Sequence, residues 1–136
     1  MKKHIVFVVV VSLALFSCNK DAAEVIPILE GKWNWKLSLY SDGTKMLPND
    51  SSVIENNYVS FTREDYTNHA QCVIGGNSAG VYKISKVDNK RILIFKSPTA
   101  RSDTFYIDVT NIQLDITEVT NSYSIKHTFF KRDKLN

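Results

Sequence analysis

The residues in this chain best suited to covalent chemistry are Ser78, Asp115 and His127. Ser78 is the centre of Gly76-Asn77-Ser78-Ala79-Gly80, and the carboxylate and the histidine follow it in the chain. This G-x-S-x-G pattern is typical of a nucleophilic serine, but only where a helix follows the sharp turn. The next residues, Val81 to Ile84, favour a strand instead. We therefore predict a hairpin loop at Ser78, no catalytic residues and no enzymatic activity.

A metal or cofactor site is not expected either. The chain has three histidines, and His69 and His127 lie far from each other and from any zinc-type ligand spacing. His127 falls among the apolar positions of its segment, where Tyr123, Ile125 and Phe129 share its parity. Two interpretations remain open for His127: a hydrogen-bonded histidine of the interior, or a residue that contacts a ligand.

The N-terminus predicts export. Met1-Lys2-Lys3-His4 is a short basic head, and the apolar run from Ile5 to Phe16 follows it. This run is too short for a membrane span, which needs about 20 residues, and fits the apolar region of a secretory signal. We expect residues 1–17 to be a signal peptide and 18–28 a tether with a short apolar turn. The remaining residues, 29–136, are expected to form one domain.

Leu15-Phe16-Ser17-Cys18 resembles the lipobox of bacterial lipoproteins. The resemblance implies a diacylglycerol on the Cys18 thiol, cleavage before Cys18 and acylation of the new amine, with palmitate among the expected acyl chains. Asn19 is not the aspartate that retains many lipoproteins at the inner membrane, so we expect an outer-membrane protein, on the periplasmic face or the cell surface. Cys72 then has no intramolecular cysteine partner, and we expect a small buried side chain or a reactive thiol.

The stretch from Gly31 to Tyr40 organises the domain. Large apolar side chains alternate with polar ones along it, with Trp33, Trp35, Leu37 and Leu39 at the odd positions. Because successive side chains of a strand point to opposite faces, this period predicts a strand with those four residues in the core. Pro27 interrupts the apolar residues just before it, so we expect a single turn there and not a continuous helix.

Seven further strands are predicted from short alternating or apolar segments bounded by turn residues. Residues 41–56 form an unusually long loop, a possible flap over a cavity or a segment packed on the outer edge. Most of the eight strands have one face in solvent and one in the core. Closure into a barrel is the expected arrangement, because it leaves no strand with an unpaired edge. The seven segments are 58–63, 66–74, 81–87, 91–96, 104–110, 112–119 and 123–131.

Gly31-Lys32-Trp33 at the start of the first strand, with the strand count and the long first loop, resembles the opening of lipocalins. The closest likeness is to the lipocalin-like domain of small Gram-negative lipoproteins, whose last strand ends in Phe-x-Arg, here Phe130-Lys131-Arg132. The resemblance implies an eight-stranded antiparallel up-and-down β-barrel. It also implies that a basic residue covers the Trp33 ring, and we expect Arg132, with Lys131 as second choice.

The composition excludes a nucleic-acid binder. Without Lys2 and Lys3 the formal net charge of +3 falls to about +1, and acidic and basic residues are mixed throughout. We predict a barrel that binds a small apolar or amphipathic molecule, with Trp35, Phe61, Tyr82 and His127 as ligand-binding residues. The alternative is a non-enzymatic protein-interaction module with a solid core, which docks a partner protein through an exposed apolar patch such as Met46, Leu47 and Ile54.

Overall fold

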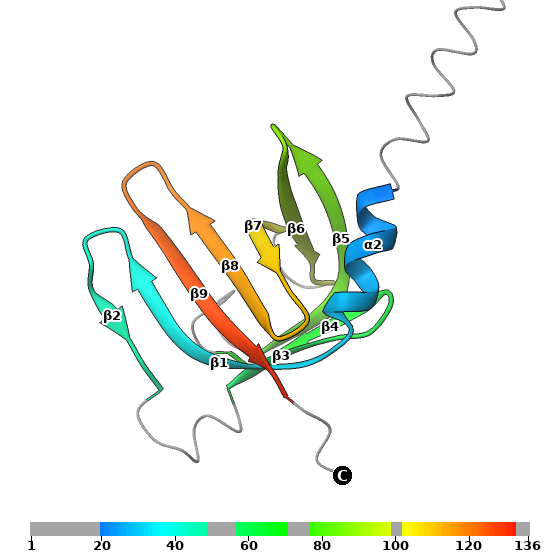
Figure 1. Ribbon diagram of the computed structural model, residues 1–136, viewed down its shortest axis with the longest axis horizontal. Helices are drawn as coiled ribbons and strands as arrows, with labels where there is room; N and C mark the ends of the chain where they lie inside the picture. The colour runs from blue at the N-terminus through cyan, green and yellow to red at the C-terminus, as the bar shows by residue number, and fades with distance from the viewer. Residues whose placement is uncertain (1–19, 49–56, 71–76, 99–101, 133–136) are drawn as a thin grey trace, which may run out of the picture.

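An antiparallel sheet curves round on itself, and a helix packs beside it, directly before the first strand (Figure 1). The computed structural model describes residues 20–48, 57–70, 77–98 and 102–132, with the side chains described from Ala23 onward. Helix α2 spans Lys20–Leu29. The strands are β1 (Gly31–Tyr40), β2 (Lys45–Met46), β3 (Tyr58–Phe61), β4 (Asp65–Asn68), β5 (Ser78–Val87), β6 (Lys90–Lys96), β7 (Asp103–Val109), β8 (Gln113–Val119) and β9 (Ser124–Lys131).

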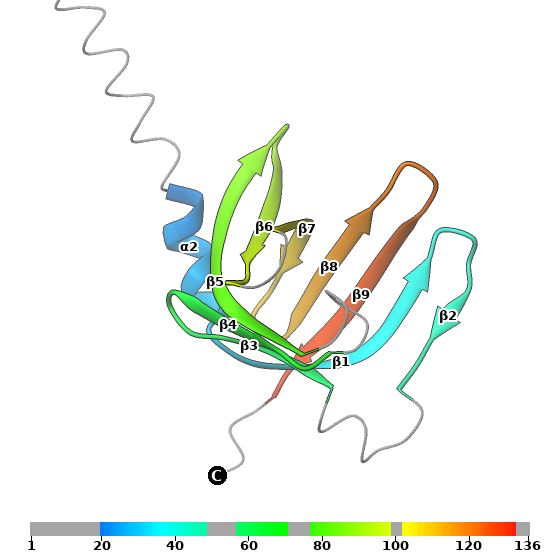
Figure 2. The ribbon, with the colours of Figure 1, turned by 180° about the vertical axis from the view of Figure 1, so that it is seen from behind.

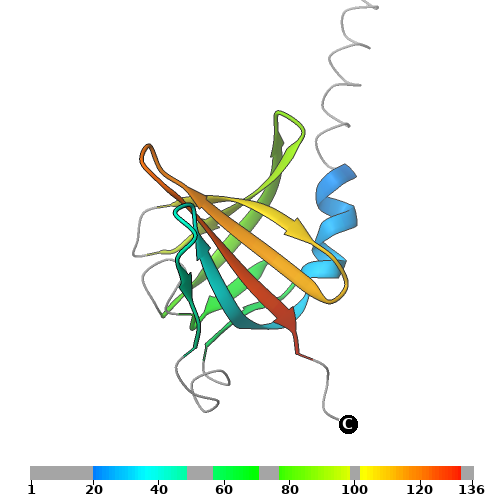
Figure 3. The ribbon, with the colours of Figure 1, turned by 60° about the vertical axis from the view of Figure 1, so that its left-hand side comes forward.

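Eight strands close into a barrel, because β9 pairs with β1 as well as with β8. All pairings are antiparallel, and the barrel strands follow one another around the wall in chain order (Figures 2 and 3). The closing seam runs from Trp33 opposite Lys131 to Tyr40 opposite Ile125. The predicted fold class, an eight-stranded antiparallel up-and-down barrel, is confirmed.

The short strand β2 is additional to the barrel. It lies within the segment predicted as a loop and pairs with the second half of β1, Ser38 opposite Met46. Strand β4 ends at Asn68, earlier than predicted, and residues 71–76 and 49–56 lie outside the described residues. The tight turn between β5 and β6 is confirmed at Asp88 and Asn89, whose φ angles of 48° and 62° are those of a two-residue hairpin turn.

The prediction that Pro27 precludes a continuous helix is wrong. Pro27 lies inside α2, in its last turn, where a missing N–H costs a single intrahelical hydrogen bond. Glu30 N still donates to Ile26 O at 3.0 Å, so the helix continues past the proline. Val25 and Leu29, one turn apart, are both buried in the core, and this packing holds the helix against the barrel.

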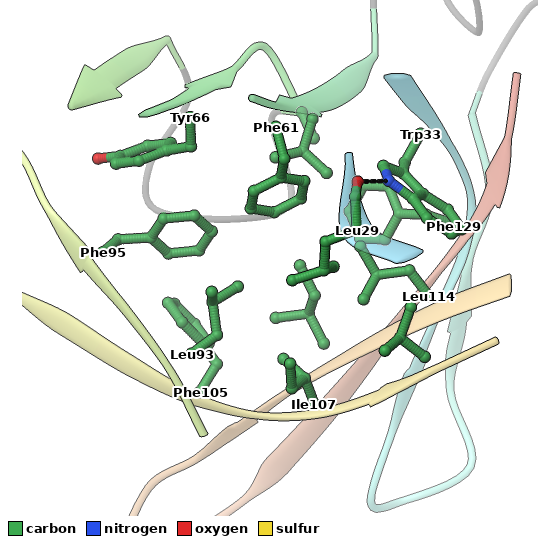
Figure 4. Packing of buried hydrophobic residues seen from close by; sticks show 14 of the residues in the cluster. Leu29, Trp33, Phe61, Tyr66, Leu93, Phe95, Phe105, Ile107, Leu114 and Phe129 are labelled. Carbon is green, nitrogen blue, oxygen red and sulfur yellow. Dashed lines mark hydrogen bonds between the residues drawn. The ribbon is translucent and has the colours of Figure 1, made fainter. Parts of the chain in front are cut away.

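The interior is filled by aromatic and aliphatic side chains of the inward-facing strand positions (Figure 4). The Phe95 ring contacts those of Phe61, Tyr66 and Phe105 at centroid distances of 6.1, 4.3 and 5.7 Å. Trp33 is fully buried, and its Nε1 donates to Leu29 O at 2.7 Å, which joins the first strand to the end of α2. Both indoles face inward, as predicted.

The second half of β1 faces the other way from the prediction. Trp35 pairs with Phe129 but Leu37 pairs with Thr128, so Lys36 is an extra residue in a β-bulge. Such a bulge shifts the alternation by one position. Leu37 and Leu39, predicted to be in the core, are therefore only half-buried, and Ser38 is the fully buried residue of this half.

Lys131, and not Arg132, covers the first tryptophan. The Lys131 Nζ lies 5.0 Å from the Trp33 ring centroid and donates to Ile28 O at 2.8 Å. Arg132 is one residue further along, and its backbone N donates to Lys32 O at 2.8 Å. The first choice made from the sequence was wrong because side chains alternate between the two faces of β9, and Lys131 has the inward parity of Phe129.

Candidate functional site

Three polar groups meet inside the barrel wall at the bulge. Trp35 Nε1 donates to Ser38 Oγ at 3.0 Å, and Ser38 Oγ lies 2.7 Å from His127 Nδ1. Their side chains are 4%, 0% and 1% exposed, respectively. The bulge at Lys36 turns Ser38 inward, and the pairing of Ser38 with His127 across the β1–β9 seam brings the two side chains together. We call Trp35, Ser38 and His127 the interior polar cluster.

The hydrogen bonds of the interior polar cluster indicate which of its atoms carry a proton. The indole of Trp35 can only donate, so Ser38 Oγ accepts from it and has its own proton to give. If Ser38 donates to His127 Nδ1, the imidazole proton lies on Nε2, and this tautomer leaves the fewest groups unpaired. His127 Nε2 is buried and has no hydrogen-bond partner among the residues that the structure describes. The cluster therefore ends in a buried N–H donor that is not satisfied.

Burial keeps His127 neutral. Removal from water disfavours the imidazolium and lowers the pKa of His127 from 6.5 to about 4. Among the described residues no carboxylate contacts either ring nitrogen, and burial is the cause of the lowered pKa. At neutral pH the cluster consists of uncharged donors and acceptors within an apolar interior.

The cluster occupies the middle of the barrel. His127 shares its interior level with Ile116, opposite it on β8, and Ser38, opposite it on β1. The next inward level is Glu118, Ile125 and Tyr40, which leads towards the β1–β2 and β8–β9 turns. Glu118 and Tyr40 are half-buried, and Ile125 is 9% exposed, so the side chains become more accessible to solvent in this direction. The end with these two turns is the far end of the barrel, opposite α2.

Phe61 and Tyr82, the other two predicted ligand-binding residues, contact each other near α2. Their ring centroids are 5.2 Å apart, and Tyr82 OH donates to the carbonyls of Thr62 and Arg63 at 2.8 and 3.3 Å. Burial, and secondarily the negative charge of Glu30, raises the pKa of Tyr82 to about 12. The four predicted residues are thus two separate pairs, Trp35 with His127 and Phe61 with Tyr82.

The residues weighed for catalysis lie apart. A strand and not a helix contains the motif's serine, as predicted, but the hairpin loop predicted at Ser78 is wrong, because β5 already begins at this residue and not at Val81. Asp115 accepts from Thr128 Oγ1 at 2.8 Å and from Gln113 Nε2 at 3.2 Å, and Lys126 Nζ lies 3.6 Å from it. His127 bonds Ser38 instead of either residue. Ser38 Oγ and His127 Nδ1 have the spacing of a nucleophile and its base, and both side chains are buried.

His69 packs its ring on Tyr58, with centroids 4.7 Å apart, and its Nδ1 lies 3.2 Å from Asn77 Oδ1. In residues 20–48, 57–70, 77–98 and 102–132 no three His, Cys, Asp or Glu side chains come together in a way that could hold a metal ion. Within the same residues, no helix has the length and apolar character needed to cross a membrane. Cys18 and Cys72 lie outside the described residues.

The fold and the interior polar cluster define a closed antiparallel β-barrel with an aromatic core and a buried serine–histidine pair. A barrel of eight strands is just wide enough to be filled by its own side chains or to hold one small ligand, so the architecture has the capacity for ligand binding.

Comparisons with known proteins return few relatives. Among solved structures, the chain is similar to a lipocalin-like protein from Bacteroides uniformis, with a TM-score of 0.49 and 18% sequence identity. The match covers 77% of this chain and 99% of that chain. No protein-family model matches the sequence, and no curated protein matches it.

Proposed function

We propose that this protein binds a small apolar or amphipathic molecule inside its barrel, entering from the far end. One observation carries the proposal: the buried Nε2 of His127 has no hydrogen-bond partner in the described part of the chain. An unsatisfied buried donor costs roughly 1–3 kcal/mol, and such groups in native proteins call for an explanation, such as a ligand or an ordered water. A bound molecule that accepts this hydrogen bond removes the cost.

The environment of His127 defines the chemical class of the ligand. A neutral N–H donor among aliphatic and aromatic side chains favours an apolar body that ends in a carbonyl, ester, hydroxyl or carboxyl oxygen. The partly exposed level formed by Tyr40, Glu118 and Ile125 is where the apolar body would lie. Phe61 and Tyr82, which pack near α2, would then support the wall and not touch the ligand's polar end.

The binding test uses cis-parinaric acid, a fluorescent fatty acid, as the probe. We expect saturable binding by the wild-type chain and several-fold weaker binding by His127→Gln. His69→Gln is the matched control, because it removes an imidazole that lies outside the cluster, and it should bind as the wild type does. The proposed site is refuted if the wild type does not bind the probe saturably. It is also refuted if His127→Gln and His69→Gln weaken the binding of the probe equally.

We also propose that the chain is anchored in the outer membrane by acyl chains on Cys18. The lipobox resemblance and the apolar run before it support this anchor. One acyl chain holds a protein only weakly, and several give stable attachment. Metabolic labelling with an alkyne analogue of palmitate should mark the wild type and Cys72→Ser but not Cys18→Ser. Membrane fractionation should find Cys18→Ser in the soluble fraction, and label on that variant would contradict the anchor.

The alternative function, a protein-interaction module, is favoured by a separate observation. Met46, the last residue of β2, and Leu47, which follows it, are 37% and 59% exposed. Ile54, the third residue predicted for this apolar patch, lies outside the described residues. Met46→Gln with Leu47→Gln should weaken a partner complex but leave binding of cis-parinaric acid intact, so the two functions can be separated.

A further inference from the structure

A groove on the outer wall of the barrel combines exposed apolar side chains with basic ones. Two adjacent hollows of about 550 and 370 Å³ share Tyr106, which lies on the outer face of β7. We call the two hollows together the outer groove. In Figure 1 the tips of the β5–β6 hairpin and the β8–β9 hairpin lie on either side of β7. The residues that line the two hollows come from both hairpins and from β7.

The floor of the outer groove consists of apolar side chains that are largely exposed to solvent. Val87, Tyr106 and Val119 are 47%, 37% and 56% exposed. They come from β5, β7 and β8, and all three line the smaller hollow together with Ile92. An apolar surface of this kind, gathered in a hollow, is typical of a contact site with a protein or a membrane.

The rim of the outer groove is basic. The larger hollow is lined by the cations Lys86, Lys90, Arg91 and Lys126 and by the carboxylates Asp108 and Asp115. Lys126 Nζ lies 3.6 Å from Asp115, and over the whole rim the four cations exceed the two carboxylates by two charges. Lys90 Nζ lies 5.4 Å from the Tyr106 ring centroid, so one cation sits directly beside the apolar floor. Cations around an apolar floor complement an anionic surface with an apolar interior.

The start of the described chain places the outer groove near the proposed anchor. Helix α2 begins at Lys20, two residues after Cys18 in the sequence. Figures 1 and 3 both show the first turn of α2 and the tip of the β5–β6 hairpin on the same side of the molecule. An anchor at Cys18 therefore brings the bilayer to the side on which this hairpin projects.

We infer that the outer groove is the surface with which the chain rests on a bilayer that carries anionic headgroups. The inference depends on the proposed anchor at Cys18, and it adds an orientation. Lys90 and Lys126 meet the headgroups, and Val87, Tyr106 and Val119 lie against the apolar boundary. Lys36 and Lys45 lie on β1 and β2, away from the hairpin, and remain in water.

The test compares lysine reactivity in the full lipidated protein. The protein is reconstituted into phosphatidylcholine vesicles with or without about 30 mol % phosphatidylglycerol, and treated with a membrane-impermeant acetylating reagent. Mass spectrometry then gives the labelling rate of each lysine. We expect the rates of Lys90 and Lys126 to fall about tenfold with phosphatidylglycerol present, and those of Lys36 and Lys45 to stay unchanged. High salt should reverse the protection.

Each other outcome has a distinct meaning. Vesicle flotation of the chain without any difference between the groove lysines and Lys36 or Lys45 overturns the docking surface and leaves the anchor standing. Failure of the chain to float with vesicles refutes the anchor, and the docking with it. Protection of Lys90 and Lys126 in detergent solution shows that a second copy fills the outer groove, which also overturns the inference. The Lys90→Gln, Arg91→Gln variant should lose the protection of Lys126, whereas Lys36→Gln, Lys45→Gln should retain it.

Discussion

Lys131 ties the last strand of the barrel to its first indole: its Nζ lies 5.0 Å from the Trp33 ring centroid and 2.8 Å from Ile28 O. Three parts of the chain meet at this ammonium group, namely the end of α2, the start of β1 and the end of β9. Trp33 in turn donates to Leu29 O, so the helix is held to the barrel by two side chains.

Lys131→Met should reduce the free energy of unfolding by about 1–2 kcal/mol, because it removes a cation–π contact and a hydrogen bond. Methionine keeps most of the aliphatic stem. Arg132→Met, the control, should change the free energy of unfolding by less than about 0.5 kcal/mol. Urea unfolding followed by tryptophan fluorescence measures both. A larger effect at Arg132 would restore the assignment made from the sequence.

Because of the β-bulge at Lys36, substitution of Ser38 should destabilise the fold more than substitution of Leu37, whereas the alternation in the sequence predicts the opposite order. Ser38→Leu should cost at least about 3 kcal/mol, because it forces a large side chain into the interior and leaves the Trp35 N–H without an acceptor. Leu37→Ser, on the outer side, should cost about 1 kcal/mol. Thermal unfolding ranks the two variants. A greater loss for Leu37→Ser would show that β1 runs without the bulge.

The barrel itself was predictable from the sequence because period-two alternation and turn residues recur along most of the chain. Trp33, Trp35 and His127 were placed inside correctly, since each keeps the parity of its own strand. The bulge was not predictable: it depends on how β1 pairs with β9, distant in the chain, and the unbroken alternation through Leu39 pointed the other way. Ser38 was missed for that reason.

Acid should weaken the fold through His127. Its pKa is about 4 in the folded chain and 6.5 when exposed, so between these values the unfolded chain binds a proton that the folded chain does not. The free energy of unfolding should therefore fall by up to about 3 kcal/mol from pH 7 to pH 4 through this group. Urea titrations of wild type and His127→Gln measure the difference. His69→Gln should keep the wild-type slope, and an equal slope in His127→Gln would contradict the assignment.

Gly80 marks a close approach between β5 and the end of β6. A Cβ at this position would lie 2.1 Å from Lys96 O, a backbone atom that cannot move aside easily. Gly80→Ala should cost at least about 2 kcal/mol of unfolding free energy. Gly43→Ala, where a Cβ meets nothing within 4 Å but φ is +89°, should cost only about 1 kcal/mol. Equal melting temperatures for the two variants would mean that β5 and β6 are further apart than described.

The candidate site shows where sequence reasoning is limited. A histidine at an apolar position predicts that some polar partner lies inside, yet nothing in the sequence says which one. Of the four predicted ligand-binding residues, two meet at Ser38 and two meet near α2, because strands that are adjacent in the wall set these contacts. The loop predicted over residues 41–56 also contains β2, whose two residues carry too little pattern to be recognised.

The pairing of β1 with β9 has a consequence for biogenesis. The first strand finds one of its two neighbours only when the last strand has been made, so the cylinder cannot be sealed while the C-terminus is still in transit. The export that we propose would therefore require the chain to cross the inner membrane unfolded and to close the barrel in one late step, with its apolar inner wall accessible to chaperones until then.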